Sequence, residues 1–266
     1  MVFNPNELIL EKIRAIEEYD PQTLELTGRY TQIEEPSLQT SAEGTDVTDA
    51  MGTPIMTFYR NQQAQLSFTN SLFSLDLAAT QFGSEKVVAG EDAKLKIPTS
   101  EIIKVSGTAE APTAELHYTP ITGTVKYVKV VNANKTFGET YILDTAASAD
   151  DKKFSLADKV ITLPKGVTGR VFVSYVRETS TGASVSKRSD GIPEIKTIWM
   201  HAIFHDPCNK NVKYAGVIVA ENAQIDPSSV EIGLKSDSKH SATYLIRPDY
   251  CNEEESKLFE ILVSQD

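Results

Sequence analysis

The chain has 266 residues, 40% of them hydrophobic, which is enough to bury a large core in one elaborate domain or two small ones. No apolar run approaches the roughly 20 residues that a membrane-spanning helix needs, so we expect no membrane insertion. The formal net charge of −11 disfavours binding to nucleic-acid phosphates.

The charge is uneven along the sequence. Residues 1–60 carry a net charge of −7, residues 61–120 of −3, residues 121–190 of +4 and residues 191–266 of −5. The lysines of the third segment suffice to cover one side of a small sheet, although a solvated surface is the simpler interpretation. The opening MVFNPNELILEKIRAIEEYD has acids where a secretory signal is basic and then apolar, so we expect synthesis in a cytoplasm.

A helix is predicted near the N-terminus. The Asn-Pro pair at 4–5 suits a helix cap followed by a first-turn proline. Ile9, Ile13 and Ile16 recur on one helical stripe, and the Asp-Pro pair at 20–21 ends the helix.

A long polar stretch follows, QIEEPSLQTSAEGTDVTDAMGTP (32–54), with too few apolar residues to belong to a core. It is predicted to be an exposed loop, and loops of this length are usually functional or disordered. We expect it to become ordered against a neighbouring subunit. The candidate inter-subunit residues are its acids, Glu34, Glu35, Glu43, Asp46 and Asp49.

A second helix is predicted within NSLFSLDLAATQFG (70–83). Leu72, Leu75, Ala79 and Phe82 fall at steps of three and four residues, which is the helical period. Gly83 supplies a C-terminal stop.

Short strands are predicted from residue 55 onward. They are rich in Val, Ile, Tyr and Phe and are separated by Gly, Pro, Asn or Asp. Ten or more strands in about 210 residues indicate a mainly β fold, an antiparallel β-sandwich or barrel with two helices added. The segments are IMTFYRNQQAQLSFTN, SEIIKVSG, AELHYT, TVKYVKVV, KVITLP, GRVFVSYVRE, EIKTIWMHAIFHD, YAGVIVA, SSVEIGLK, ATYLIRP and KLFEILVS.

The stretch HAIFHDPC (201–208) raises the question of a metal site. On a helix, His201 and His205 would share one face at the i, i+4 spacing that zinc enzymes use. On the predicted strand they lie about 13 Å apart, at roughly 3.3 Å per residue, which is too far to bind one zinc ion. We therefore predict no metal site. Cys208 and Cys251 are too few for a disulfide framework, and we expect both to be core thiols.

No catalytic signature is present. The sequence has no GxSxG, Walker loop or GxGxxG motif. Two SxxK matches, at Ser184 and Ser236, lie in polar loop sequence without a strand-to-helix context. Adjacent carboxylates, such as those at 253–255, lie where they are solvated rather than converging in a cleft. We predict neither an enzyme nor a cofactor.

Two stretches together carry a family resemblance. In TFYRNQQAQLSFTNSLFSLDLAATQFGSEKVVA (57–89) an alternating strand runs through LSFTN into a helix that closes on FG. In IWMHAIFHDPCNKNVKYAGVIVAENAQIDPSSVEIGLKSDS (198–238) one strand ends in DPC and two more follow. These patterns, about 75 residues long in total, resemble the tail tube proteins of long-tailed bacteriophages.

The resemblance implies a structural protein of the virion. Tail tube subunits form hexameric rings that stack into a hollow cylinder, and strands from each subunit close a β-barrel around the lumen. An acidic inner wall would let DNA pass without specific binding. The implied partners are further copies of the chain and other tail proteins, with assembly in the host cytoplasm. No catalytic residue is implied.

We predict three parts in the chain. Residues 1–54 form an N-terminal helix and an acidic loop arm, and residues 55–120 together with 191–266 form a tube-like β core. The basic segment 121–190 is predicted to be an inserted β subdomain, which the resemblance does not account for.

Two alternatives remain open. The chain could be another phage virion component, a tail terminator or a head-decoration protein. It could also be a carbohydrate-binding β-sandwich with Tyr118, Tyr127, Tyr175 and Trp199 as a stacking platform, although strand alternation places such rings more readily in a core.

Overall fold

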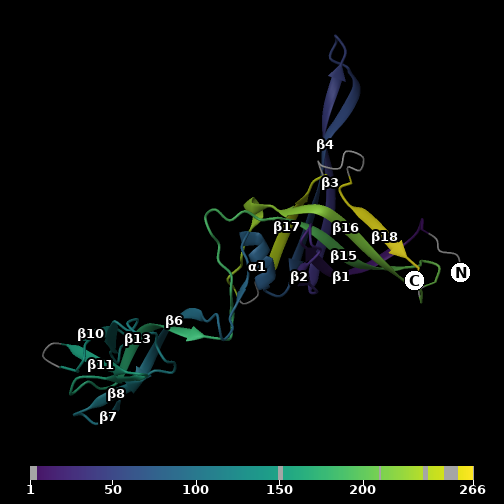
Figure 1. Ribbon diagram of the computed structural model, residues 1–266. Coiled ribbons are helices and arrows are strands. Elements are labelled where there is room, and N and C mark those ends of the chain that lie inside the picture. Colours follow the sequence, from purple (N-terminus) through teal and green to yellow (C-terminus); the bar gives the residue numbers. More distant parts are fainter. Residues whose placement is uncertain (1–4, 149–151, 210, 236–238, 249–256, 266) are drawn as a thin grey trace. The chain divides into compact units, whose positions relative to one another are not determined.

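The computed structural model describes residues 5–148, 152–209, 211–235, 239–248 and 257–265. The chain forms two compact units (Figure 1). Unit 1 comprises Met1–Lys86 and Val185–Asp266, and unit 2 comprises the intervening Val87–Ser184. Strands account for 56% of the chain, which confirms the mainly β class. No helix in the described ranges has the length and apolar character to cross a membrane.

Among the described residues, unit 1 contains an eight-stranded antiparallel sheet. Its strands follow the order β2-β1-β15-β16-β17-β4-β3, and β18 also pairs with β16. The long β16 accommodates both partners on one edge, because β17 pairs with its C-terminal end and β18 with its N-terminal half. The strands are β1 (Ile9–Tyr19), β2 (Leu26–Tyr30), β3 (Ile33–Thr48), β4 (Pro54–Asn70), β15 (Ile195–His205), β16 (Lys213–Ile225), β17 (His240–Ile246) and β18 (Glu260–Ser264).

One face of this sheet forms the core of unit 1. Alternation along β15 points Ile198, Met200 and Ala202 into the interior, where each is at most 3% exposed. The strand predicted for EIKTIWMHAIFHD, with these three residues on one face, is therefore confirmed.

The sheet curls into a half-barrel, which brings its two ends toward each other. β2 ends at Tyr30 and β3 begins at Ile33, which means that two residues join opposite edges. The rings of Tyr30 and Phe68 have centroids 5.8 Å apart, and the backbone N–H of Ser71 donates to the carbonyl of Gln32 at 3.0 Å. The curled sheet therefore wraps around its own core.

The predicted second helix is confirmed, but it is shorter than expected. Helix α1 (Leu75–Phe82) begins at the N-cap Ser74, whose side chain accepts a hydrogen bond from the first-turn backbone. It ends at Gly83, where φ is +60° and an added Cβ would collide with the backbone of Ile192. Leu72 precedes the helix and is 60% exposed.

Unit 2 contains, in its described residues, a second eight-stranded sheet with the order β6-β13-β9-β10-β11-β12-β8-β7. All its pairings are antiparallel except that of β10 with β11. Val105 alone separates β6 from β7, so here too the edge strands are consecutive in the chain. β5 and β14 pair where the chain enters and leaves the unit. The strands are β5 (Val87–Val88), β6 (Leu95–Lys104), β7 (Ser106–Gly107), β8 (Pro112–Glu115), β9 (Tyr127–Val131), β10 (Phe137–Leu143), β11 (Lys153–Ala157), β12 (Val160–Thr162), β13 (Arg170–Thr179) and β14 (Ala183–Ser184).

The predicted N-terminal helix is wrong, because residues 9–19 form strand β1. β1 pairs with β15 on one side and with β2 on the other. The helix-like spacing has a structural cause. A β-bulge between Ile13 and Ala15 adds one residue to β1, so Ile13 and Ile16 both face inward although three positions separate them. Their partners on β15, Ala202 and Met200, are two positions apart.

The predicted loop at 32–54 is also wrong, because most of it is strand β3 and the turn into β4. β3 pairs with β4 at thirteen positions. Its distal half is exposed on both faces, so it lacks the apolar alternation that identifies a strand in sequence. The segment IMTFYRNQQAQLSFTN is confirmed as strand, in β4.

The limits of unit 2 differ from the predicted insertion at 121–190. The unit begins at Val87, because β6 pairs along its whole length with β13 and ties the preceding residues into the same sheet. Unit 2 carries 11 acidic and 12 basic side chains, whereas unit 1 carries 26 and 14. The charge contrast between the parts therefore persists with the new boundaries.

Candidate assembly surface

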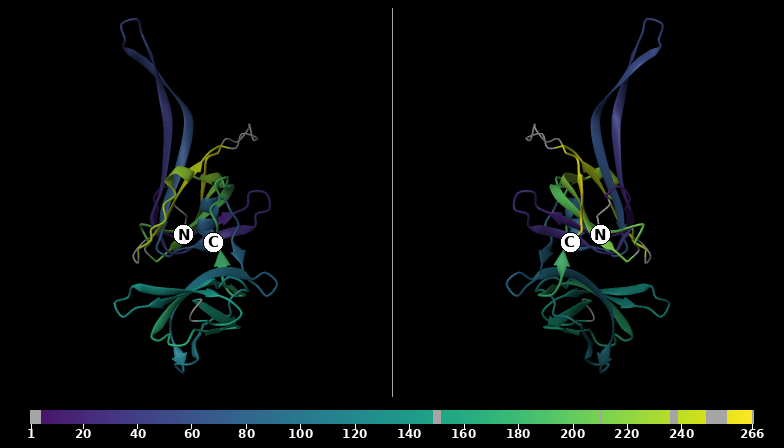
Figure 2. Two further views of the ribbon diagram at one scale, coloured as in Figure 1. Left: turned by 90° about the vertical axis from the view of Figure 1, so that its left-hand side faces the viewer. Right: turned by 90° about the vertical axis from the view of Figure 1, so that its right-hand side faces the viewer.

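The β3–β4 hairpin continues beyond the sheet of unit 1 as a two-stranded arm, which we define as residues 41–63 (Figure 2). β17 pairs with β4 only from Ala64 to Asn70, so no third strand of the described chain accompanies the arm. Every arm residue is exposed except the half-buried Thr57 and Gln63. Isolated two-stranded hairpins are at best marginally stable in water. Above its base, the arm therefore has no third strand of the described chain to support it.

Cross-strand pairing gives the arm two different faces. Val47 lies opposite Met56, and Phe58 follows on the same face, with exposed fractions of 44%, 57% and 45%. We call these three residues the apolar stripe. On the other face, the hydroxyl of Thr57 donates to Oδ1 of Asp46 at 2.6 Å. That face also carries Ile55 and Tyr59, each 69% exposed, so apolar side chains suited to burial lie on both faces of the arm.

Asp49 organises the tip of the arm. Its Oδ1 accepts hydrogen bonds from the backbone N–H groups of Met51 and Thr53, each at 2.8 Å. Gly52 has a φ of +83°, the left-handed conformation that glycine adopts without strain. The backbone donors of Thr53 and Met51 lower the pKa of Asp49. The tip is therefore a defined turn.

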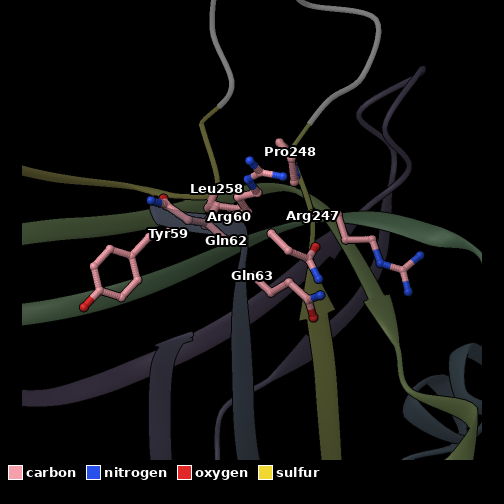
Figure 3. A pocket seen from close by; sticks show the side chains of 8 residues that line it. Tyr59, Arg60, Gln62, Gln63, Arg247, Pro248 and Leu258 are labelled. Carbon is pink, nitrogen blue, oxygen red and sulfur yellow. The ribbon is translucent and has the colours of Figure 1, made fainter. Parts of the chain in front are cut away.

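At the base of the arm, β4 contains a bulge. Asn61 has a φ of +53°, and β4 advances three residues while β3 advances from Ser41 to Glu43. A hollow of about 660 Å³ lies beside the bulge (Figure 3). It is lined by residues 59–63 of β4 and by Arg247, Pro248 and Leu258.

Arg60 and Arg247 both line this hollow, and their guanidinium groups point in different directions (Figure 3). Within the described ranges, neither guanidinium has a hydrogen bond or an ion pair. The amide side chains of Asn61, Gln62 and Gln63 also line it, and none of the lining residues that the structure describes is a carboxylate. The described lining of the hollow therefore offers hydrogen-bond donors and positive charge.

The five predicted acids are not brought together. Glu43 and Asp46 lie on opposite faces of the arm, and Asp49 lies at its tip. Glu34 lies at the other end of β3, where its carboxylate accepts from the hydroxyl of Ser71 at 2.5 Å and pairs with a lysine of its own unit. Glu35 has a φ of +49° in a bulge of β3.

The sequence gives no sign that the acid Glu18 of unit 1 is completely buried. It is 0% exposed, and its carboxylate accepts hydrogen bonds from the hydroxyls of Tyr244 and, at 2.8 Å, of Thr80. Burial raises the pKa of Glu18, and these two donors oppose the rise. The carboxylate therefore joins β1, β17 and α1. In the sequence it forms part of an adjacent acid pair that we expected to be solvated.

The histidines of HAIFHDPC have separate partners. His201 Nε2 lies 2.8 Å from Oε2 of Glu17, and His205 Nε2 lies 2.5 Å from Oε2 of Glu11. Both histidines are on β15, as the strand prediction requires. In the described part of the chain, no group of three or more His, Cys, Asp or Glu side chains is placed to hold a metal ion.

The prediction of core thiols is wrong for Cys208, which is exposed. It lies in the turn after β15, where its backbone N–H donates to Oδ1 of the buried Asp206 at 2.8 Å. The turn holds Cys208 away from the interior. Cys251 lies outside the described residues.

The four aromatic residues considered as a stacking platform do not form one. Trp199 belongs to unit 1, and Tyr118, Tyr127 and Tyr175 belong to unit 2. Tyr175 is only 3% exposed, and Trp199 packs against Tyr19 with ring centroids 4.4 Å apart. The arrangement therefore does not support the carbohydrate-binding alternative.

Comparison with known sequences shows the family to which the chain belongs. No curated protein matches it. The model of the YomU/Tube protein family, a phage tail tube family, matches residues 10–257, which include the arm and all of unit 2. Proteins of this family are structural components of the phage virion that assemble with themselves into a tube. Since the match covers nearly the whole sequence, the chain belongs to the YomU/Tube protein family and is a structural subunit of a phage tail tube, not an enzyme.

Proposed function

We propose that the subunits form hexameric rings that stack into the conduit through which DNA is ejected. The unpaired strand edges of the arm are the observation that supports this proposal. In the described residues, β3 has no partner on its outer edge, and β4 has none beyond Ala64 on the side of β17. Each arm therefore offers two open strand edges, which the arms of two neighbours complete. A ring of arms joined in this way is a closed β-barrel around a lumen.

The apolar stripe supports the same arrangement. Val47, Met56 and Phe58 are each at least 44% exposed in the single chain. Complete burial of side chains of this kind contributes roughly 1.5–3 kcal/mol each. Contacts between the barrel and the neighbouring ring would remove these side chains from water. The stripe therefore favours assembly over the free subunit.

The charge of the arm suits a wall that DNA passes without binding. The arm has three acids, Glu43, Asp46 and Asp49, and one basic residue, Arg60. An excess of negative charge repels the DNA backbone, so DNA does not adhere to the wall. We assign these three acids to the contacts between subunits and to the lumen. The nearly neutral unit 2 lies away from the lumen, and assembly takes place in the host cytoplasm.

Electron microscopy of the purified protein and of an armless variant tests the proposal. Residues 45–58 are replaced by Asn-Gly, a dipeptide that closes a two-residue hairpin. The wild type should form tubes, whereas the armless variant should remain monomeric. Fluorescence of Trp199, the one tryptophan in the sequence, should show that unit 1 still folds.

A matched control shortens the turn between β9 and β10 in unit 2, where the backbone N–H of Asn132 donates to the carbonyl of Thr136 at 2.9 Å. This variant should assemble like the wild type. Tubes of normal width from the armless variant would contradict the role of the arm.

A further inference from the structure

We infer that Arg60, with Arg247 beside it, binds the carboxylate of Glu43 from the arm of a neighbouring copy of the chain. This inference rests on the proposed function, because it requires the arms of adjacent subunits to lie side by side. It assigns the hollow at the base of the arm as a receptor for one acid of the partner.

The position of the hollow suits a neighbouring strand. Ile246, the last residue of β17, pairs with Ala64 of β4, and Arg247 follows at once. Among the described residues, no strand pairs with β4 beyond this point on the side that β17 covers, and the hollow lies beside residues 59–63 (Figure 3). A strand from a second copy that pairs with this edge therefore passes the hollow that Arg60 and Arg247 line. This added strand pairs with β4 in line with β17.

Among the described residues, the charges at the hollow have no counter-ion. Arg60 has no ion pair there, so a carboxylate of a neighbouring copy can pair with its guanidinium without displacing another acid of the described chain. Arginine suits this role because its planar donors can bind both oxygens of a carboxylate. The hollow is therefore complementary to an acidic side chain.

Glu43 is the arm acid that is available. Asp46 already accepts from Thr57 at 2.6 Å, and Asp49 accepts from the backbone of the tip. Glu43 has neither a hydrogen bond nor an ion pair among the described residues. Among the described residues of one subunit, the acid and the two arginines thus have no ion-pair partner.

Symmetry explains why Glu43 meets Arg60 of the next subunit. The two residues are cross-strand partners within one arm, so their side chains lie on the same face of the arm and at the same distance from its tip. When the arms run along the symmetry axis of the ring, the rotation that relates one subunit to the next leaves the position of each residue along that axis unchanged. Glu43 on β3 of one arm then lies level with Arg60 on β4 of the next. The same pairing recurs at every interface of the ring.

Charge reversal with mixing provides the test. Glu43→Arg and Arg60→Glu each place like charges at every interface, so each variant alone should need at least about tenfold more protein for half-maximal tube formation. An equimolar mixture should assemble nearly as well as the wild type. When the two variants alternate around the ring, the two introduced side chains face each other at one interface. At the next interface the native Glu43 faces the native Arg60, so every interface again joins opposite charges.

Mixing separates contacts between subunits from contacts within an arm. Within each variant the two positions of one arm carry like charges whether or not the other variant is present. A pair confined to one arm therefore gains nothing from mixing, and a mixture as poor as its components would overturn the inference. The double variant E43R/R60E should assemble in either case and shows that both positions tolerate exchange.

Further variants distinguish loss of the contact between Glu43 and Arg60 from unfolding of unit 1 and from failure of the proposed function. Each single variant should keep the Trp199 unfolding transition of the wild type. Lys94→Glu, a charge reversal in unit 2, should assemble normally, and Arg247→Ala should raise the required protein concentration by roughly threefold. Wild-type protein that forms no tubes refutes the proposed function itself. Normal assembly of R60E together with reduced binding of a double-stranded DNA fragment would assign the arginines to DNA and overturn this inference.

Discussion

His240 Nε2 lies 2.8 Å from Oε1 of Gln81, and this contact ties β17 to helix α1. The amide nitrogen of Gln81 donates to the carbonyl of Ser241 at 2.8 Å, so its oxygen faces the imidazole and His240 Nε2 is the donor. His240 Nδ1 then accepts from the backbone N–H of Ser74, the N-cap of α1, at 3.4 Å. Only the neutral imidazole satisfies both contacts.

Acid should therefore weaken unit 1. Burial lowers the pKa of His240 from its ordinary value of 6.5. The unfolded chain binds a proton near that ordinary value while the folded chain does not, so the free energy of unfolding falls as the pH drops below it. One proton gives a slope of at most about 1.4 kcal/mol per pH unit. Urea titrations followed by Trp199 fluorescence should show the loss, and His240→Gln should remove it. An unchanged slope in H240Q would assign the loss to another group.

Removal of the Tyr244 hydroxyl should destabilise unit 1 strongly. Its hydroxyl donates to the buried carboxylate of Glu18, which Tyr244→Phe leaves with one donor fewer. A buried polar group left without a hydrogen-bond partner costs about 1–3 kcal/mol of unfolding free energy. Tyr19→Phe is the matched control, because that hydroxyl donates at 2.7 Å to Glu17, whose side chain is partly solvated. Its cost should stay below about 1 kcal/mol. Equal losses of unfolding free energy in the two variants would show that the hydrogen bond from Tyr244 to the buried carboxylate contributes no more than the one from Tyr19 to Glu17.

Two isoleucines distinguish strand from helix at the N-terminus. Ile16 is 0% exposed, so Ile16→Ala should lower the unfolding free energy by about 2–5 kcal/mol. Ile9 is 54% exposed, and Ile9→Ala should change it by no more than about 0.5 kcal/mol. A helix with both residues on its buried stripe would make the two costs similar. Thermal or urea unfolding of both variants decides between these outcomes.

The arm should be sensitive to protease only before assembly. Arg60 is the one trypsin site between residues 41 and 63. Trypsin should cut there readily in monomers, because a hairpin without packing partners opens often. In tubes the cut should slow by at least about tenfold, since neighbouring arms hold the strands together. Mass spectrometry of the fragments measures both rates, and equal rates would mean that assembly leaves the arm uncovered.

Unit 2 should be dispensable for tube formation. A variant in which a short Gly-Ser linker joins Lys86 to Val185 lacks the whole of unit 2 and keeps the sheet of unit 1 intact. The paired β5 and β14 bring the ends of the insertion together, so a short linker spans them. Electron microscopy should show tubes with the wild-type lumen and an altered outer surface. A collapse of the lumen would place unit 2 in the wall.

Strong local patterns made part of this structure predictable from sequence. The alternation in β15 predicts both faces of the strand, because one face is buried and the other meets solvent. The helical period and Gly83 predict α1. These elements are also those in which local preference and burial agree. The two stretches that resemble tail tube proteins include both of them.

The remaining elements depend on contacts that a sequence pattern does not show. The bulge between Ile13 and Ala15 gives a strand an apparent three-residue repeat, which in sequence predicts a helix. The arm carries no buried face, so its strand character is not visible as alternation. Arg60 and Arg247 line one hollow only because β4 and the end of β17 are neighbours, although most of the chain separates them in sequence.

The short pair formed by β5 and β14 affects how the chain folds. β1 and β15 pair across the whole of unit 2, so closing that contact in an unfolded chain spans a loop longer than roughly 100 residues. Once unit 2 is folded, β5 and β14 hold its two ends together and shorten the effective loop. Removing the residues of unit 2 from the loop between Tyr19 and Thr197 shortens it about twofold, which lowers the entropic cost of closure by roughly 0.6 kcal/mol. Early folding of unit 2 therefore accelerates formation of the sheet that bears the arm.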